Sequence, residues 1–355
     1  MANLVIPKLE KDGLNLKAVR KLREEEGNTK LVEVEKPKIK DKEVLLKIWA
    51  GGICGSDLLI EKDKHFYEAP VTLGHEFSGI VEEVGAAIEE IEPGDRIAAD
   101  IETEEGWLGV TRDGAFAPYM AVPEEQALVY PEDVSLDHIC FTEPVVATIH
   151  SLQETTTVEA GDFVVVVGPG PMGLLGVQFA KLRGADEVAL IGLKNVDEAR
   201  LKTGEKTGAD HILYSEEDPA ETIMDLTDDR GADLVLEASA SEKGVQHAID
   251  CARKAPEGRG GRGEIAEISL WGEPITLDLD PLSLNQLSIH GAWSWRGTET
   301  WRRAVTLITK GVFDLDPLIT NRYDLNEWKT AFERLNTKKD IKAFIHWICG
   351  GNWKR

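Results

Sequence analysis

Hydrophobic and polar residues follow one pattern early in the chain and a different pattern later. Residues 29–50 (TKLVEVEKPKIKDKEVLLKIWA) and residues 71–99 alternate apolar and polar positions, with breaks at Pro and Gly. Alternation with a period of two is typical of antiparallel strands that have one solvated face. We therefore predict that residues 1–125 are mostly β-strand, joined by tight glycine turns.

A strand-turn-helix-strand pattern begins near residue 145. The apolar stretch VVATIHSLQ predicts a helix, and FVVVVGPGPMGLLGVQFAKLRGADEVALIG then predicts a strand, a glycine turn, a helix and a second strand. Because both strands are continuously apolar, they are expected in a buried parallel sheet. Similar units at GADHILY and GADLVLEAS extend the alternation, which indicates a doubly wound sheet.

The pattern near the end of the chain returns to the β-rich region. The segment DLDPLITNRYDLNEWKTAFERLNTKKD predicts a strand, a loop and a helix beside the first domain. A chain of 355 residues is long enough for two domains with a cleft between them. We predict an α/β fold in which a β-rich catalytic domain is formed by residues 1–144 and 294–355. A Rossmann domain with a doubly wound parallel sheet is predicted for residues 145–293.

Composition and charge exclude several classes of protein. The chain has 64 acidic and 40 basic residues, a formal charge of -24 that repels nucleic acid and anionic membranes. This charge either reflects adaptation to salt or heat or simply solvates the surface. The sequence contains no apolar run of about 18 residues, and its first residues lack a basic start followed by an apolar stretch. Cys54, Cys140, Cys251 and Cys349 form no CxxC pair, so we expect a cytoplasmic protein without disulfides.

A glycine-rich turn after the first strand of the predicted parallel sheet is the candidate dinucleotide site. Gly168, Gly170 and Gly173 satisfy GxGxxG between a strand and a helix. In such a turn the first glycine makes the bend, the second admits the pyrophosphate and the third lets helix and strand pack closely. The helix N-terminus then supplies free amide groups to the phosphates. Pro171 and Met172 complete this turn and are candidate cofactor-binding residues with the three glycines.

The end of the second predicted strand favours NADP over NAD. An acidic residue about 20 positions after the glycines would hold the ribose hydroxyls of NAD, but Gly192 and Lys194 stand in this region. A cation there suits a 2′-phosphate. Two alternatives stay open, because Asp197 and Glu198 follow closely and Lys194 is a residue type common on solvated surfaces.

The stretch GGICGSDLLI, residues 51–60, places Cys54 in a polar, glycine-flanked turn that suits a metal ligand or a nucleophile. His75 and Glu76 follow in LGHEFSG, and thiolate, imidazole and carboxylate together form a zinc site with one position left open. An adjacent His and Glu in an apolar strand are costly to bury without a partner, which favours the metal. A nucleophilic Ser56 is disfavoured because no GxSxG motif surrounds it, and a cysteine hydrolase would not explain the dinucleotide turn.

With these residues the chain resembles the zinc-dependent medium-chain dehydrogenase family, in its polyol, sugar and threonine dehydrogenase branch. The matching motifs, in family order, are GGICGSD, LGHEFSGIVEEVG, PGDRI, DGAFAPYM, FTEPVVATIH, the GxGxxG unit, GADLVLEAS and PLITNRYDL. The resemblance implies a GroES-like catalytic domain and a homodimer or homotetramer, with LSIHGAW at the edge where subunits pair.

The resemblance also implies roles for individual residues. Cys54 and His75 match ligands of the catalytic zinc, and Glu76 binds it directly or in an alternative state. Glu143 supplies or supports the remaining position. Asp57 matches the residue that orients the histidine, and Ser56 matches a proton acceptor.

Three departures from the family pattern change what is expected. Leu59 stands where many relatives carry a histidine that passes protons to solvent, so the relay must end elsewhere, through ribose hydroxyls or His65, although an ordinary loop position explains His65 as well. The segment ADIETEEGWLGVTR holds none of the cysteines of a structural zinc lobe, so one zinc per subunit is expected. Trp293, Ser294 and Trp295 with Arg296 fall where the cleft should face the nicotinamide, either as pocket walls or as interface packing.

The sequence therefore predicts a zinc-dependent oxidoreductase that transfers hydride between a secondary hydroxyl of a small polyol or sugar-like substrate and NAD(P). The alternatives are a threonine-type or simple secondary alcohol dehydrogenase, or a dinucleotide-binding protein without catalysis. The intact set of Cys54, His75, Glu76 and Glu143 argues against the non-catalytic alternative, because these polar groups are costly to bury without a function.

Overall fold

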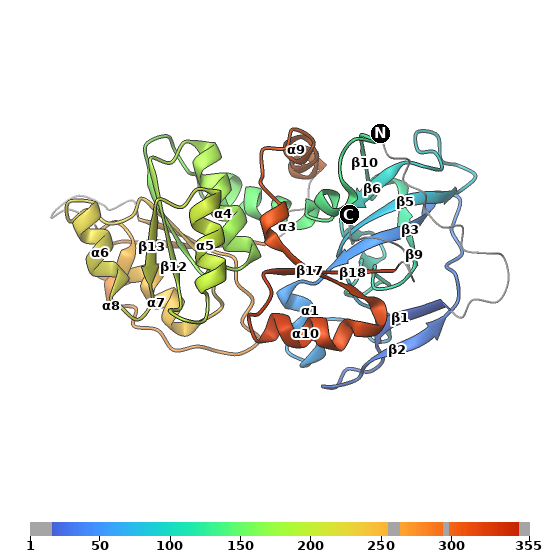
Figure 1. The fold of residues 1–355 in the computed structure, drawn as a ribbon, viewed down its shortest axis with the longest axis horizontal. Coiled ribbons are helices and arrows are strands. Elements are labelled where there is room, and N and C mark those ends of the chain that lie inside the picture. The colour runs from blue at the N-terminus through green and yellow to red at the C-terminus, as the bar shows by residue number, and fades with distance from the viewer. Residues whose placement is uncertain (1–15, 255–262, 294–297, 348–355) are drawn as a thin grey trace.

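The computed structural model describes residues 16–254, 263–293 and 298–347. A β-rich domain and a domain with helices around a parallel sheet lie side by side (Figure 1). The predicted α/β fold class, a Rossmann-like parallel sheet beside a GroES-like domain, is confirmed.

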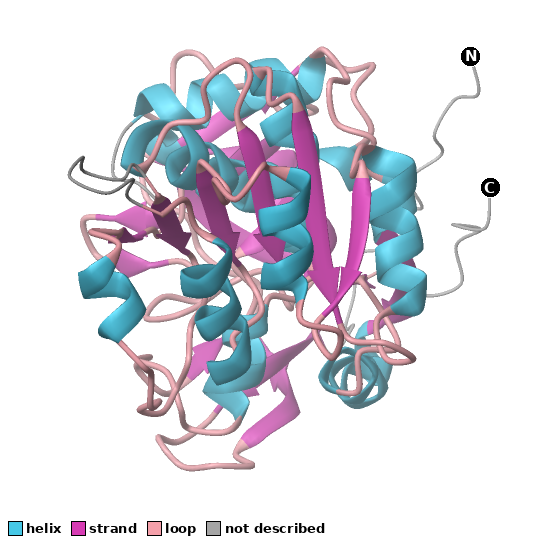
Figure 2. Cartoon of the chain, turned by 90° about the vertical axis from the view of Figure 1, so that its left-hand side faces the viewer, coloured by secondary structure: helices cyan, strands magenta, loops and turns pink. Residues whose placement is uncertain are grey.

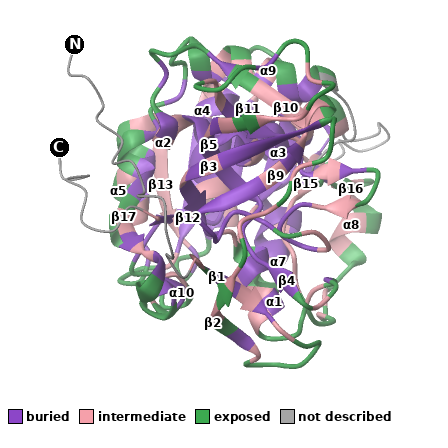
Figure 3. Ribbon diagram, turned by 90° about the vertical axis from the view of Figure 1, so that its right-hand side faces the viewer, coloured by how far each residue is buried: buried purple, intermediate pink, exposed green. Residues whose placement is uncertain are grey.

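The β-rich domain is built on a seven-stranded sheet in the order β10-β6-β5-β3-β18-β17, with β9 also paired to β3. Its strands are β3 Glu43–Gly52, β5 Glu76–Val84, β6 Arg96–Ala99, β9 Tyr119–Pro123, β10 Ala127–Tyr130, β17 Ile319–Asp324 and β18 Lys342–His346. Smaller sheets flank it, formed by β1 Leu16–Lys21, β2 Thr29–Val34 and β4 Val71–Thr72, and by β7 Glu102–Thr103 with β8 Gly106–Trp107. Figure 3 shows β3, β5 and β9 as buried strands at the centre of this domain.

The second domain contains a six-stranded, fully parallel sheet in the order β13-β12-β11-β14-β15-β16. Its strands are β11 Phe163–Val167, β12 Glu187–Gly192, β13 His211–Tyr214, β14 Leu234–Glu237, β15 Glu264–Glu267 and β16 Ser288–Gly291. Every residue of β11 is buried, as expected for the central strand of a doubly wound sheet. Figure 2 shows helices on both sides of these strands.

The helices connect the strands and cover both sheets. They are α1 Gly55–Glu61, α2 Leu136–Ile139, α3 Thr142–Ile149, α4 Pro171–Arg183, α5 Glu198–Thr207, α6 Pro219–Leu226, α7 Glu242–Cys251, α8 Asp280–Leu284, α9 Thr298–Thr309 and α10 Trp328–Asn336. Short helical turns occur at η1 Glu124–Gln126, η2 His150–Thr155, η3 Asp316–Leu318 and η4 Leu325–Glu327. Within the described ranges, none of these helices has the length and apolar character needed to cross a bilayer.

The late segment returns to the β-rich domain, as the sequence predicts. Strand β18 pairs antiparallel with β3, and β17 pairs parallel with β18, so these late strands complete the sheet that β3 begins. One cluster of buried apolar side chains also continues from Val44 of β3 through Val146 of α3 to Val166 of β11. The predicted boundaries at residues 144 and 293 stay a prediction.

The helix that follows Cys54 was not predicted from the sequence. Residues in GGICGSDLLI, which we interpreted as a glycine-flanked turn, leave strand β3 and enter α1 directly after Cys54. Its buried positions Ser56, Asp57 and Ile60 face the interior with helical spacing. Helix α1 has only seven residues, so its hydrophobic periodicity was too short to distinguish a helix from a turn.

Candidate functional site

The end of β3 and the start of α1 position Cys54. Cys54 precedes the first residue of α1, and its backbone N–H donates to Asp57 Oδ2 at 2.9 Å. A carboxylate in the first helical turn satisfies a backbone donor that the helix itself leaves unpaired. Asp57 thus fixes the backbone that carries the cysteine.

Strand β5 brings His75 and Glu76 to the same place. In the antiparallel register of β3 and β5, Gly52 lies opposite Glu76, so the residues that follow β3 meet those that begin β5. One donor atom from each of Cys54, His75 and Glu76 lies within 4.8 Å of the other two. Ligands on a tetrahedral zinc with bonds of about 2.0–2.3 Å would be separated by roughly 3.5 Å, so small side-chain adjustments suffice to bring this set onto one ion.

The charges around this cluster also suit a cation. Burial alone would lower the pKa of His75, but the Asp57 carboxylate and the Cys54 sulfur outweigh burial and raise that pKa well above its usual range. His75 Nδ1 lies 3.8 Å from Asp57 Oδ1, so the carboxylate stands directly behind the imidazole. Burial raises the pKa of Asp57 as well, which shows how costly its charge is without a positive neighbour. These residues therefore fit a zinc ion, whose positive charge they would share.

Glu143 of helix α3 lines a pocket that Cys54 and His75 also line. Burial raises the pKa of Glu143 to about 7, although the neighbouring His75 opposes the rise. A carboxyl group with such a pKa takes up or releases a proton near neutral pH. Glu143 is not part of the three-residue cluster, so its assignment as a ligand stays a prediction.

Sequence reasoning missed Lys342 of β18, which forms an ion pair with Glu76. Both side chains are almost fully buried, and Lys342 Nζ also donates to the Ile53 carbonyl at 3.0 Å. The Glu76 carboxylate fits here because residue 52 is glycine. A Cβ at this position would collide with that carboxylate. Lys342 comes from a strand far along the chain, so neither spacing nor local pattern could have indicated this contact.

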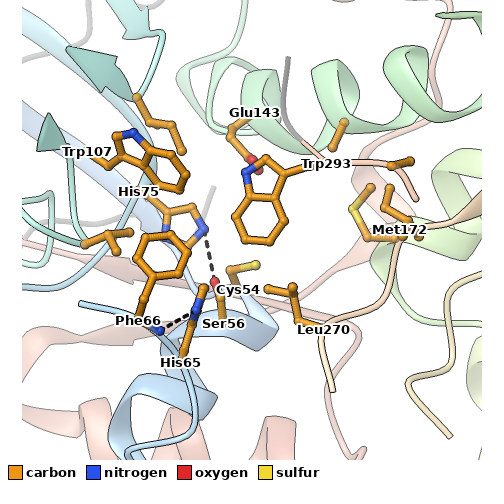
Figure 4. A pocket seen from close by; sticks show the side chains of 15 residues that line it. Cys54, Ser56, His65, Phe66, His75, Trp107, Glu143, Met172, Leu270 and Trp293 are labelled. Atoms are coloured by element: carbon orange, nitrogen blue, oxygen red, sulfur yellow. Dashed lines mark hydrogen bonds between the residues drawn. The ribbon is translucent and has the colours of Figure 1, made fainter. Parts of the chain in front are cut away.

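A pocket with a cavity volume of about 100 Å³ opens above the cluster (Figure 4). Its walls come from both domains, because Met172 of the glycine-rich turn lines it together with Cys54 and His75. The other lining residues are Ser56, His65, Phe66, Ile101, Trp107, Val110, Glu143, Ala147, Ile268, Leu270, Ala292 and Trp293. Ser56 Oγ lies 3.4 Å from His75 Nε2, within reach of a group held at the cluster.

Three aromatic side chains form one wall of this pocket. The Phe66 ring packs edge-on against Trp107 with centroids 4.8 Å apart, and Trp293 lies 6.0 Å from Trp107 and 6.1 Å from Phe66. Trp107 belongs to the short β7–β8 hairpin, in the segment that lacks the cysteine lobe. Trp293 therefore lies in the pocket wall, which was one of the two alternatives for this residue. Ser294, Trp295 and Arg296 lie outside the described residues.

The glycine-rich turn has the backbone geometry of a phosphate-binding turn. Gly168 has φ +100°, which favours glycine, and a Cβ there would lie 2.7 Å from the Ser239 backbone. A Cβ on Gly173 would overlap the Gly168 carbonyl, so this position also requires glycine. Gly170 precedes Pro171, the first residue of α4, and open space surrounds it where a ligand could approach. Pro171 contributes no N–H at a position where the helix needs none.

Beside this turn lies a second pocket with a cavity volume of about 230 Å³. Gly168, Gly170 and Gly192 line it, and so do three cationic side chains, namely Arg200, Lys243 and Lys338. Asp197 also lines it; its buried carboxylate accepts from Leu193 N at 3.0 Å and lies 3.8 Å from Arg200 and 3.9 Å from Lys338.

Lys194 is not among the residues that line this second pocket. Its half-exposed side chain pairs with Glu217, and its ammonium lies 5.1 Å from the centre of the Tyr214 ring. The sequence indicated Lys194, after β12, as the cation near the cofactor. In the structure, the cations that line the second pocket are instead Arg200, Lys243 and Lys338. Arg200 and Lys338 were missed because they come from helix α5 and from a turn after α10.

Two carboxyl groups lie side by side where β14 and β15 end. Glu237 and Glu267 are partners in the parallel register, and their side chains hydrogen bond to each other. Glu237 is fully buried and accepts from Ser239 N at 2.9 Å and from Ser269 Oγ at 2.6 Å. Burial together with the Glu237 charge raises the pKa of Glu267 to about 8, so this pair holds a proton at neutral pH.

Comparison with known proteins agrees with this arrangement. The family model for zinc-binding dehydrogenases matches residues 171–310, and the model for the alcohol dehydrogenase GroES-like domain matches residues 40–132. The second match includes the Cys54, His75 and Glu76 cluster, and the first begins at Pro171, the first residue of α4, and includes Gly173.

Individual relatives match over nearly the whole chain. A sorbitol dehydrogenase of Halalkalibacterium halodurans is 31% identical over 93% of this chain and 99% of its own length. A D-arabitol-phosphate dehydrogenase of Enterococcus avium is 31% identical over 88% of this chain and 92% of its own. The crystal structure of a zinc-binding dehydrogenase from Sinorhizobium meliloti 1021 bound to NADP superposes with a TM-score of 0.81 at 27% identity, over 93% of this chain and 99% of that one. The chain belongs to the zinc-dependent medium-chain dehydrogenase family and is an oxidoreductase of the alcohol dehydrogenase type.

Proposed function

We propose that the protein oxidises a secondary hydroxyl of a small, uncharged polyol or related alcohol and passes the hydride to NAD(P). The observation that carries this proposal is the shared pocket, which Cys54 and His75 line from one domain and Met172 of the dinucleotide turn from the other. A hydroxyl placed near the first two residues and a nicotinamide that enters past Met172 would meet in one small cavity. Bringing two reactants together in this way is a large part of catalysis.

The residues proposed to hold the catalytic zinc are Cys54 and His75, with Glu76 or Glu143 as the third ligand. Zinc held by these residues would supply Lewis-acid chemistry, which lowers the pKa of an alcohol hydroxyl. Asp57 behind His75 keeps the imidazole in place, and the Lys342 ammonium balances the charge of Glu76. One zinc per subunit is expected, since the β7–β8 segment offers no cysteine.

The reaction transfers a proton and a hydride. The hydroxyl loses its proton and the carbinol carbon loses a hydride, so the alcohol becomes a ketone and NAD(P)⁺ becomes NAD(P)H. We propose Ser56 as the proton acceptor, because its Oγ lies 3.4 Å from His75 Nε2 and lines the pocket. Leu59 cannot pass the proton on, so the next carrier is a cofactor hydroxyl or water.

The charge of the pocket supports an uncharged substrate. Of the described residues, those that line the pocket include neither lysine nor arginine, while Glu143 adds a carboxyl group. A polyol phosphate, like the D-arabitol phosphate in the name of the Enterococcus avium relative, would enter without a counter-ion, and its desolvation would then be costly. The zwitterion of threonine needs partners for two charges, which makes the threonine-type alternative less favourable.

We propose NADP as the preferred cofactor. The cations Arg200, Lys243 and Lys338 beside the glycine-rich turn support this choice, as does the NADP bound to the Sinorhizobium meliloti relative. Lys194 stays the predicted 2′-phosphate contact, although in this structure it faces Glu217. Asp197 supports the alternative, NAD, because its carboxylate lines the same pocket.

A second copy of the chain is the proposed partner, as a homodimer or homotetramer. Strand β16, the LSIHGAW segment, forms an edge of the parallel sheet, and Ile289 on it is 38% exposed. An edge strand with unpaired backbone groups is a template for pairing with another chain. A cytoplasmic location stays a prediction.

The test is zinc analysis followed by assays of NADP and NAD reduction with polyols, aldoses, sugar acids, threonine and simple secondary alcohols. We expect about one zinc per chain and a clear rate on an uncharged polyol with NADP. Cys54→Ser should lose metal and turnover together, whereas Cys251→Ser, which removes a buried thiol that does not line the pocket, should retain both. Zinc-bound protein without activity on any alcohol would contradict the proposal.

A further inference from the structure

The pocket wall contains one polar side chain whose function the proposed reaction does not use. His65 follows α1 and lines the pocket with Phe66, Trp107 and Trp293. Its ring contacts Phe66 edge-on with centroids 4.4 Å apart and Trp293 with centroids 5.9 Å apart. These aromatic neighbours hold the imidazole in a defined orientation in the pocket wall.

The hydrogen bonds of His65 decide which ring nitrogen carries its proton. The Phe66 backbone N–H donates to His65 Nδ1 at 2.8 Å (Figure 4). A nitrogen that accepts a hydrogen bond is unprotonated, so the proton of the neutral ring is on Nε2. Burial, with a smaller contribution from His75, lowers the pKa of His65 to about 4, so the ring is neutral at pH 7.

The Nε2–H group has no acceptor in the part of the chain that the structure describes. A donor beside apolar rings loses hydrogen bonds with water when a substrate fills the cavity, unless that substrate offers an oxygen. The other polar groups that line the pocket surround the metal cluster. His65 is not part of that cluster, so it offers a separate donor for an oxygen of the substrate other than the hydroxyl that is oxidised.

We propose that His65 is a specificity-determining residue whose Nε2–H donates a hydrogen bond to a second hydroxyl of the substrate. This inference rests on the proposed function, since it assumes that the first hydroxyl sits at the metal cluster. The carbon skeleton between the two hydroxyls packs against Phe66, Trp107 and Trp293. The substrate class is then an uncharged diol or polyol that presents an apolar face, and alcohols with a single hydroxyl are poorer substrates.

The size of the effect follows from the hydrogen bond that is gained or lost. Leaving a buried donor without its partner is penalised, and a tenfold change in kcat/KM corresponds to about 1.4 kcal/mol. We therefore expect kcat/KM to be about tenfold higher for a diol than for the mono-alcohol with the same skeleton.

Cyclohexane-1,2-diol, cyclohexane-1,3-diol and cyclohexanol form a matched substrate set for the test. The zinc-loaded enzyme would be assayed as wild type, as His65→Phe, which keeps an aromatic ring but removes the donor, and as His65→Gln, which keeps an N–H donor. His138→Gln is the control, because His138 pairs with Asp316 outside the pocket. Calorimetric titration of each variant with the better diol and with cyclohexanol adds a measurement of binding that does not depend on turnover.

We expect His65→Phe to lose the roughly tenfold preference for the better diol, because kcat/KM for cyclohexanol rises once no donor is left unpaired and the diol loses its partner. His65→Gln should recover part of the preference, and His138→Gln all of it. Equal kcat/KM for diol and mono-alcohol in the wild type, or an unchanged preference in His65→Phe, would overturn the role of His65 and leave the proposed function standing. A wild-type enzyme that oxidises no alcohol would instead refute the proposed function, and with it this inference.

Discussion

Replacing Glu267 with Gln should stabilise the protein, and by an amount that grows with pH. Glu267 and Glu237 share a proton where β14 and β15 end, and the pKa of Glu267 is raised to about 8 by burial and by the Glu237 charge. In the unfolded chain this carboxyl group would ionise near pH 4.5. Between these two pH values the folded state holds a proton that the unfolded state has lost, so stability falls as pH rises.

The magnitude follows from the two pKa values. A rise from 4.5 to about 8 corresponds to an upper limit of ~5 kcal/mol above pH 8, at ~1.36 kcal/mol per pH unit. Because Glu267 is only partly buried, solvent screening reduces this limit, and we expect ~2 kcal/mol. Gln cannot ionise, and its amide N–H can still donate to the Glu237 carboxylate. For a chain of this size, ~2 kcal/mol corresponds to a rise in Tm of ~3 °C.

Scanning calorimetry of wild type and Glu267→Gln at pH 5, 7 and 9 provides the assay. The Tm of the variant should exceed that of the wild type by less than ~1 °C at pH 5 and by ~3 °C at pH 9. Glu264→Gln is the matched control, since it removes a carboxyl group from the opposite face of the same strand. An equal gain at pH 5 and pH 9, or a lower Tm of the variant at pH 9, would refute the shared proton.

Three further predictions concern the two pockets. Lys194→Asp should shift cofactor preference from NADP toward NAD, as measured by KM for each cofactor. If only Lys338→Asp shifts it, the 2′-phosphate contact is made by the residues that line the second pocket and not by Lys194. Gly52→Ala should lower kcat more than about tenfold with an unchanged circular dichroism spectrum, because the new Cβ displaces the carboxylate of Glu76; full activity would mean that the Glu76 position is unimportant. Trp107→Leu should raise KM for a polyol by about tenfold with kcat within threefold, since it removes ring contacts but no reacting group; an unchanged KM would exclude this wall from substrate binding.

Local sequence patterns predicted the fold class and singled out three residues that the structure brings together. The run of valines followed by GxGxxG specified β11, its turn and α4, because strand, turn and helix each leave a signal within a few residues. Cys54, His75 and Glu76 were identified as a group from residue chemistry, and β3 and β5 bring them together.

The contacts that the sequence did not predict join segments that are far apart. Lys342 reaches Glu76 only because β18 pairs with β3, and Trp107 meets Phe66 only through the position of a short hairpin. No periodicity or spacing encodes such a meeting. For Lys194, the position in the sequence suggested a contact with the 2′-phosphate, whereas in the structure its ammonium forms an ion pair with Glu217.

The ion pair between Glu76 and Lys342 has a consequence for biosynthesis. Cys54, His75 and Glu76 are translated early, whereas Lys342 follows the entire parallel sheet in the sequence. Strand β18 can pair with β3 only after the parallel-sheet domain between them has been translated. The Glu76 carboxylate therefore gains its ammonium partner in the same late step that closes the sheet of the β-rich domain.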